Sequence, residues 1–259
     1  LAIADTRDAL FTSDASSNSN NWTPNALQHS DVMPDTPTNG FATLNIIDER
    51  GTVTLQEGNL SATISTNGNV TATIAPSSGK WYWETYINDS TNPYLGIQKM
   101  ESAGSSSTGY SQDAVALNNG GDIYYDASNQ SKEGSPSWTN GDIIGCAYDV
   151  DNDKIWWSKN GQWYSADASS ESAISVATVE AGNNAYDLSS QITNGVVFYG
   201  SSSTSGKVTV NFGQDSSFNA NKVAQGNADS NGKGDFFYAP PSGFLALCNA
   251  NLPDPAIDP

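Results

Sequence analysis

The amino-acid sequence predicts an all-β protein built from short strands, arranged as a sandwich or a barrel. Of its 259 residues only 15% are charged, whereas Ser, Thr, Asn, Gly and Asp are abundant, and these types favour turns and short strands over helices. Turn signals recur between short apolar runs, which is typical of such folds. The third observation is the segment 141–163, GDIIGCAYDVDNDKIWWSKNGQW, which holds the strongest hairpin signal of the chain, Asn160-Gly161.

The predicted strands are short runs rich in β-branched and aromatic residues. Clusters of Asn, Gly, Asp or Ser separate many of them. In chain order, we expect strands at Ala42–Ile47, Thr52–Gln56, Leu60–Ser65, Val70–Ala75, Lys80–Asn88, Tyr94–Lys99, Ala114–Asn118, Asp122–Tyr125, Asp142–Asp149, Lys154–Lys159, Gly195–Tyr199, Lys207–Phe212 and Gly243–Cys248. Only Ser170–Ala181 and Ala185–Thr193 leave room for a short helix.

Side-chain alternation along two of these strands indicates which residues fill the interior. Trp81 and Trp83 lie on one face of their strand, and Tyr82 and Glu84 lie on the other, so one of these pairs should fill the core. The neighbours Trp156-Trp157 must point to opposite faces. We expect one of them in the core and the other over a sheet edge or in solvent.

The two ends of the chain differ in composition from its middle. Residues 1–40 contain the polar stretch Ser13–Asn21 and several prolines, so we expect an arm or linker that docks through Trp22, Leu27 and Val32. Residues 41–250 would form one sandwich domain, and 251–259 a Pro-rich linker. Because the chain does not begin with Met, we expect a processed product or a fragment.

The formal net charge of −18 restricts the classes of partner. Phosphate contacts need clustered Lys and Arg, and the ten basic residues are scattered, which argues against nucleic acid and anionic membranes. No apolar run reaches transmembrane length, so membrane insertion is not expected. Cys146 and Cys248 lie in apolar strands as two buried thiols, or as a disulfide if their strands are neighbours.

Four motifs in a fixed order resemble the signatures of a SPRY domain. The motifs are Ser78–Glu84, Leu95–Ile97, Gly141–Gly161 and Val210–Gly213. The resemblance covers residues 41–250 and implies a concanavalin-A-like sandwich of two curved antiparallel sheets, with an extended N-terminal arm.

The flanking segments are similar to SPRY modules of bacteriophage virion proteins, notably tail-fibre-like chains. The segments that carry this similarity are Asp35–Asn45, Glu57–Leu60 and Pro241–Pro253. The resemblance implies a segment of a longer structural protein, located in the virion or outside the cell.

The sequence matches the known patterns of catalytic and metal-binding sites poorly. Asp149, Asp151 and Asp153 begin like a calcium-binding EF-hand loop, but the sixth position is Lys154 rather than Gly and the twelfth is not Glu, so calcium is the weaker alternative to a solvated turn. The single histidine, His29, lies in the predicted linker, which excludes a Ser–His–Asp triad inside the sandwich. We expect no enzymatic activity and no cofactor.

Binding is the function that the resemblance implies, through loops at one rim of the sandwich. The candidate loops are Glu101–Gln112, Ala127–Asn140 and Trp163–Ser169. Their aromatic residues suit sugar or peptide recognition, since they combine a flat apolar face with polar neighbours. The candidate binding residues are Tyr110, Trp138, Trp163 and Tyr164. The alternative is that the tryptophans pack beneath their own loops.

The sequence thus predicts a non-enzymatic adhesion or structural module of a phage virion. Its expected partners are a host cell-surface glycan or protein, or neighbouring virion chains, including copies of itself. Two alternatives stay open: a purely architectural capsid or tail decoration protein, and a secreted polysaccharide-acting enzyme or lectin of the same fold. The ligand, the host and the oligomeric state are not determined by the sequence.

Overall fold

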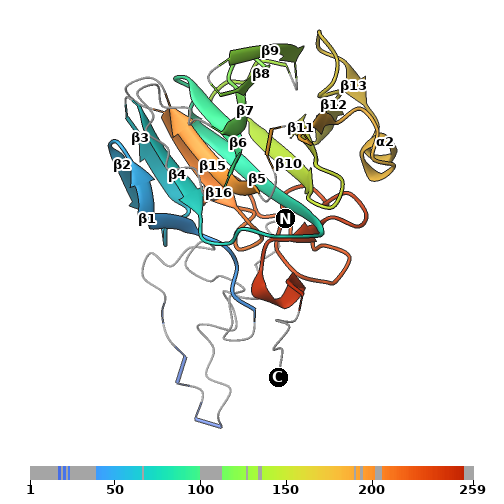
Figure 1. Ribbon diagram of the computed structural model, residues 1–259. Helices are drawn as coiled ribbons and strands as arrows, with labels where there is room; N and C mark the ends of the chain where they lie inside the picture. Colours follow the sequence, from blue (N-terminus) through green and yellow to red (C-terminus); the bar gives the residue numbers. More distant parts are fainter. Residues whose placement is uncertain are drawn as a thin grey trace, which may run out of the picture.

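A computed structural model shows two facing β-sheets, which confirms the predicted all-β sandwich (Figure 1). It describes residues 17–18, 20–21, 23, 39–65, 67–99, 113–126, 128–133, 136–189, 191–192, 195–201 and 206–253. Most of the predicted arm, 1–40, and the end of the predicted linker, 254–259, lie outside these ranges. Within them, no helix is long and apolar enough to cross a membrane.

The first sheet has seven strands among the described residues, and every neighbouring pair is antiparallel. Its order is β1 (Leu44–Arg50), β4 (Gly68–Ala72), β15 (Gly195–Ser201), β6 (Pro93–Lys99), β7 (Ala114–Asn118), β8 (Asp122–Tyr125) and β9 (Ser128–Glu133).

The second sheet has ten strands in the described part of the chain. Its main path is β13 (Ala173–Ile174), β12 (Gln162–Tyr164), β11 (Lys154–Lys159), β10 (Ile143–Asp149), β5 (Lys80–Asp89), β16 (Gly206–Asn211), β3 (Ser61–Ile64) and β2 (Val53–Gln56). Two short strands join it off this path: β14 (Tyr186–Asp187) pairs with β11, and β17 (Leu245–Ala246) runs parallel to the start of β5.

The predicted strands agree closely with these bounds in the middle of the chain and differ near its ends. The strand β9 was missed because its residues, SNQSKE, are polar throughout. The 170–181 stretch holds the short helix α2 (Val176–Glu180), capped by the Ser175 hydroxyl. In the 185–193 stretch the chain forms β14 and turns rather than a helix, and after β17 it forms the 3₁₀ turn η2 (Asn249–Asn251).

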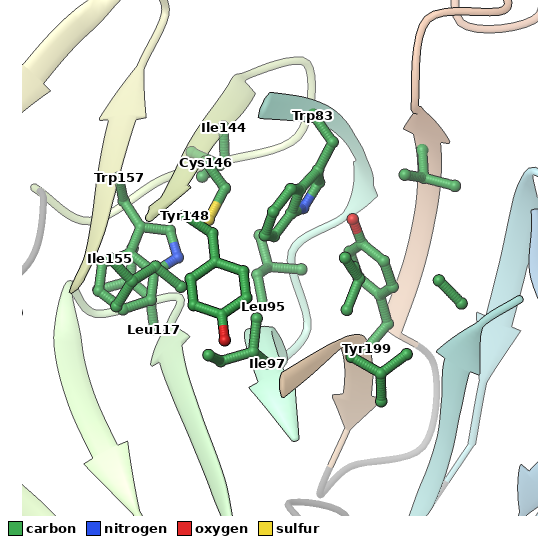
Figure 2. Close-up of a cluster of buried hydrophobic side chains, with 14 of the residues drawn as sticks. Trp83, Leu95, Ile97, Leu117, Ile144, Cys146, Tyr148, Ile155, Trp157 and Tyr199 are labelled. Carbon is green, nitrogen blue, oxygen red and sulfur yellow. The ribbon is translucent and has the colours of Figure 1, made fainter. Parts of the chain in front are cut away.

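The main core lies between the two sheets. Figure 2 shows Trp83, Cys146, Tyr148 and Trp157 of the ten-stranded sheet gathered with Tyr199 and other side chains of the seven-stranded sheet. Further members of this cluster are Trp81, Leu95, Ile97, Leu117 and Ile155. The predicted tryptophan face of β5 therefore does fill the core.

A second apolar layer covers the outer face of the ten-stranded sheet. Residues 213–248, which we call the C-terminal cap and which run from orange to red in Figure 1, place Phe236 and Phe244 against Tyr82 and Trp156. The expectation that one of Trp156-Trp157 covers a sheet edge or faces solvent is wrong, because both are fully buried. The cap supplies the covering layer.

The two cysteines lie in different layers. Cys146 belongs to the core between the sheets, and Cys248 belongs to the layer beneath the cap. Both are free and buried, and burial raises the pKa of each thiol. The sheet between the two layers separates them, so the disulfide alternative does not apply.

Candidate binding rims

Trp138, one of the predicted binding residues, lies in the interior. It is 3% exposed and belongs to the core between the sheets, and its backbone N–H donates to the Asn119 carbonyl at 3.2 Å. Its indole Nε1 has no hydrogen-bond partner. Trp138 thus closes one rim of the sandwich from inside and offers no exposed ring face.

Trp163 and Tyr164 lie on the short strand β12. The Trp163 ring is 5% exposed and contacts Tyr82 with ring centroids 6.3 Å apart, beneath the cap. Tyr164 is half-buried, and burial followed by the nearby charge of Glu171 raises its pKa. For both tryptophans the structure therefore supports packing beneath loops, and of these three residues Tyr164 is the most accessible.

Tyr110 lies outside the described residues, as does its loop, Glu101–Gln112. The described residues on either side of this loop are Lys99 and Asp113, and Asp113 directly precedes the first residue of β7. Trp138 contacts Asn119, just past the last residue of the same strand. Asp113 and the Trp138 contact therefore lie at opposite ends of β7.

Two of the three aspartates of the acidic turn, Asp149 and Asp151, serve separate structural roles. The carboxylate of Asp149 is buried, lies 3.2 Å from the Lys80 ammonium and accepts a hydrogen bond from the Asn152 amide at 2.9 Å. Asp151 accepts from the backbone N–H of Gly79 at 2.9 Å. No group of three or more His, Cys, Asp or Glu side chains that could hold a metal ion occurs in the described part of the chain. The turn therefore provides no gathered calcium ligands.

The rim around Trp138 is held by a dense hydrogen-bond network. The Asn140 side chain accepts from Ser90 N–H at 2.7 Å, and the Asn160 amide donates to Asp142 at 2.7 Å. Lys159 lies 3.3 Å from the same carboxylate. Burial alone would raise the pKa of Asp142, but these hydrogen bonds and the lysine charge outweigh it and lower the pKa. The polar side chains named here are thus engaged with other groups of the same rim.

The opposite rim joins the two sheets through tyrosines and acidic residues. We call Asp113, Tyr125, Asp126, Tyr186 and Asp187 the tyrosine rim. Burial raises the pKa of the Tyr125 hydroxyl, and the charges of Asp113 and Asp126 raise it further. Burial also raises the pKa of Tyr186. The nearby Tyr125 and Asp187 raise this pKa further. Asp126 and Asp187 are exposed, Tyr125 is half-buried and Tyr186 is 6% exposed, so this rim presents negative charge beside one accessible aromatic ring.

Two lysines limit that negative charge. Lys99 is exposed at the end of β6, and Lys154 lies near enough to Asp187 to lower its pKa, after the larger effect of hydrogen bonds from Ser189. The Lys154 ammonium also donates to the Gly182 carbonyl at 2.7 Å. Sequence reasoning missed this rim because its residues come from separate turns that only sheet stacking brings together.

Comparison with known proteins identifies the central part of the sandwich. Residues 80–185 match the family model described as the SPRY domain. This stretch of the chain is therefore similar to a SPRY domain. The match runs from the first residue of β5 to the residue before β14, so it includes three of the four predicted motifs almost completely and excludes Val210–Gly213.

Solved structures that resemble this chain include two human ones. The crystal structure of the SPRY domain of human HERC1 aligns with 16% identity and a TM-score of 0.48, covering 64% of this chain and 96% of that one. A crystal structure of a human SPRY domain aligns with 16% identity and a TM-score of 0.42, covering 62% and 95% respectively. No curated protein matches the sequence.

Proposed function

We propose that this chain is a non-enzymatic binding module that contacts a protein partner through the tyrosine rim. The observation that carries the proposal is the SPRY match over residues 80–185, because SPRY domains are generally interaction modules that bind other proteins. The same match makes a polysaccharide-acting enzyme the weaker alternative.

The tyrosine rim is the surface to test first. Tyrosine rings give a large contact area at low entropic cost, and their hydroxyls can hydrogen-bond at an edge exposed to water. The exposed carboxylates of Asp126 and Asp187 would favour a basic segment of the partner. At the opposite rim, polar side chains form hydrogen bonds within the rim, and Trp138 is buried.

We further propose that the module belongs to a bacteriophage virion protein and faces a host cell surface or neighbouring virion chains. The support is the similarity of the segments Asp35–Asn45 and Pro241–Pro253 to phage SPRY modules. A net charge of −18 also suits a soluble, externally presented module.

The two ends of β8 offer a matched test. Asp126→Lys reverses a charge on the tyrosine rim, and Asp122→Lys makes the same change at the opposite end of the strand. Binding of both variants and the parent chain would be measured against envelope-protein preparations from candidate hosts and against a glycan array. We expect Asp126→Lys to weaken protein binding at least tenfold and Asp122→Lys to leave it unchanged.

Three other outcomes would contradict parts of the proposal. Equal loss in both variants would remove the tyrosine rim as the site. Binding to glycans alone would favour the lectin alternative. Absence of binding to either probe, together with virion electron microscopy that places the chain on the capsid or tail shaft, would favour the architectural alternative.

A further inference from the structure

Glu84 is a fully buried carboxyl at the centre of the ten-stranded sheet. It lies on β5, on the face turned away from the core and toward the C-terminal cap. Its two oxygens accept four hydrogen bonds, and two of these come from consecutive backbone N–H groups of the cap, Phe237 at 2.8 Å and Tyr238 at 2.7 Å. The Tyr82 hydroxyl donates at 3.0 Å and the Asn211 amide at 3.3 Å.

These contacts fasten the middle of the cap to the sheet. The Asn211 amide bridges Glu84 to the Asp235 carbonyl, which it contacts at 2.8 Å. Immediately beside this point, Phe236 contacts the Tyr82 ring with centroids 5.1 Å apart. Release of Glu84 would therefore free the cap where it covers the aromatic outer face of the sheet.

No basic residue in the described ranges forms an ion pair with Glu84. The titratable groups that face it are Tyr82 on its own strand and Tyr238 on the cap, both of them neutral at ordinary pH. From β16 it is faced by Asn211, which is neutral at every pH. A charge on Glu84 is therefore held by hydrogen bonds alone.

We propose that Glu84 is a pH-responsive clasp for the C-terminal cap: protonation of this carboxyl tightens the cap on the sheet, and proton loss loosens it. The protonated form fits the site because the Tyr82 hydroxyl can accept as well as donate. The ionised form keeps all four donors but carries the cost of a buried, unpaired charge.

The titration of the Glu84 carboxyl sets the direction of the pH effect on cap opening and the pH range over which it occurs. Burial raises the pKa of Glu84 from 4.5 to about 7, while the hydrogen bonds from Tyr238, Phe237, Tyr82 and Asn211 each lower it. Because the pKa is higher in the closed state, closure is favoured fully below pH 4.5 and the advantage is lost as pH rises through 7. The cap-opening constant would rise by about 300-fold over the whole range, and by roughly 70-fold between pH 5 and 8.

Amide hydrogen exchange of Phe237 and Tyr238 measures this opening directly. Rates would be recorded from pH 5 to 8 and corrected for intrinsic base-catalysed exchange. Glu84→Gln should abolish the pH dependence of the opening constant. The matched control is Glu180→Gln, since the Glu180 carboxylate also accepts a cap N–H, that of Ser242 at 2.8 Å, but at an exposed position. The control should keep the full dependence.

A flat or falling opening constant in the parent chain would overturn the clasp, as would an unchanged slope in Glu84→Gln. If Glu84→Gln does not fold, carbon-13 NMR titration of the parent carboxyl decides the question. A midpoint near pH 7 supports the clasp, and a midpoint below pH 5 refutes it.

Discussion

Trp156 offers the sharpest test of the two-layered architecture. Its side chain is fully buried beneath the C-terminal cap, its Nε1 donates to the Asn183 carbonyl at 2.7 Å, and it meets the Phe244 ring edge-on with centroids 6.0 Å apart. Truncation of a buried tryptophan to alanine costs about 3–5 kcal/mol, and the Asn183 carbonyl would also lose its donor, at about 1 kcal/mol. We therefore expect Trp156→Ala to lower the free energy of unfolding by about 4–6 kcal/mol.

Urea unfolding followed by circular dichroism would measure this loss beside two comparison variants. Trp157→Ala, in the core between the sheets, should cost a similar amount because that side chain is equally buried. Trp156→Phe keeps an aromatic ring but removes the donor to Asn183, so about 1–2 kcal/mol is expected. A cost below about 1 kcal/mol for Trp156→Ala, with a large cost for Trp157→Ala, would refute a cap that covers the outer face.

Two further predictions concern single positions. Gly161 has a φ of 81°, and a Cβ there would lie 2.8 Å from the Tyr238 ring, so Gly161→Ala should destabilise the fold by about 1–3 kcal/mol in the same urea assay; a neutral effect would contradict the close approach of the cap to this turn. The second prediction concerns Cys146 and Cys248, which are both free and buried. A thiol reagent should therefore label neither cysteine in the folded chain and both in denaturant. The absence of labelling in denaturant without reductant would instead indicate a native disulfide.

Local sequence signals were sufficient where one turn or one strand decides the outcome. The Asn160-Gly161 turn has φ values of 50° and 81°, as the type I′ prediction requires. The bounds of β7, β8 and β11 match the predicted ranges, since turn residues flank each apolar run. The alternation of Trp81 and Trp83 likewise identified the core face of β5 correctly.

The candidate sites were less accessible to sequence reasoning. Trp138 and Trp163 looked like loop aromatics, yet the structure buries both, because each has an apolar cluster to enter that only the stacked layers create. The sequence placed Glu84 on the strand face opposite Trp81 and Trp83 but gave it no role. Its role depends on Phe237 and Tyr238, which lie more than 150 residues away in the chain.

The sequence by itself determined the all-β class and most strand bounds, because strand periodicity and turn chemistry are local properties of neighbouring residues. Only the tertiary structure decided that both Trp156 and Trp157 are buried, that the two rims are separate and that Glu84 fastens the cap. The physical reason is that the burial of Trp156 and the hydrogen bonds of Glu84 depend on residues 213–248 folding back over a sheet face that strand alternation alone would leave in water.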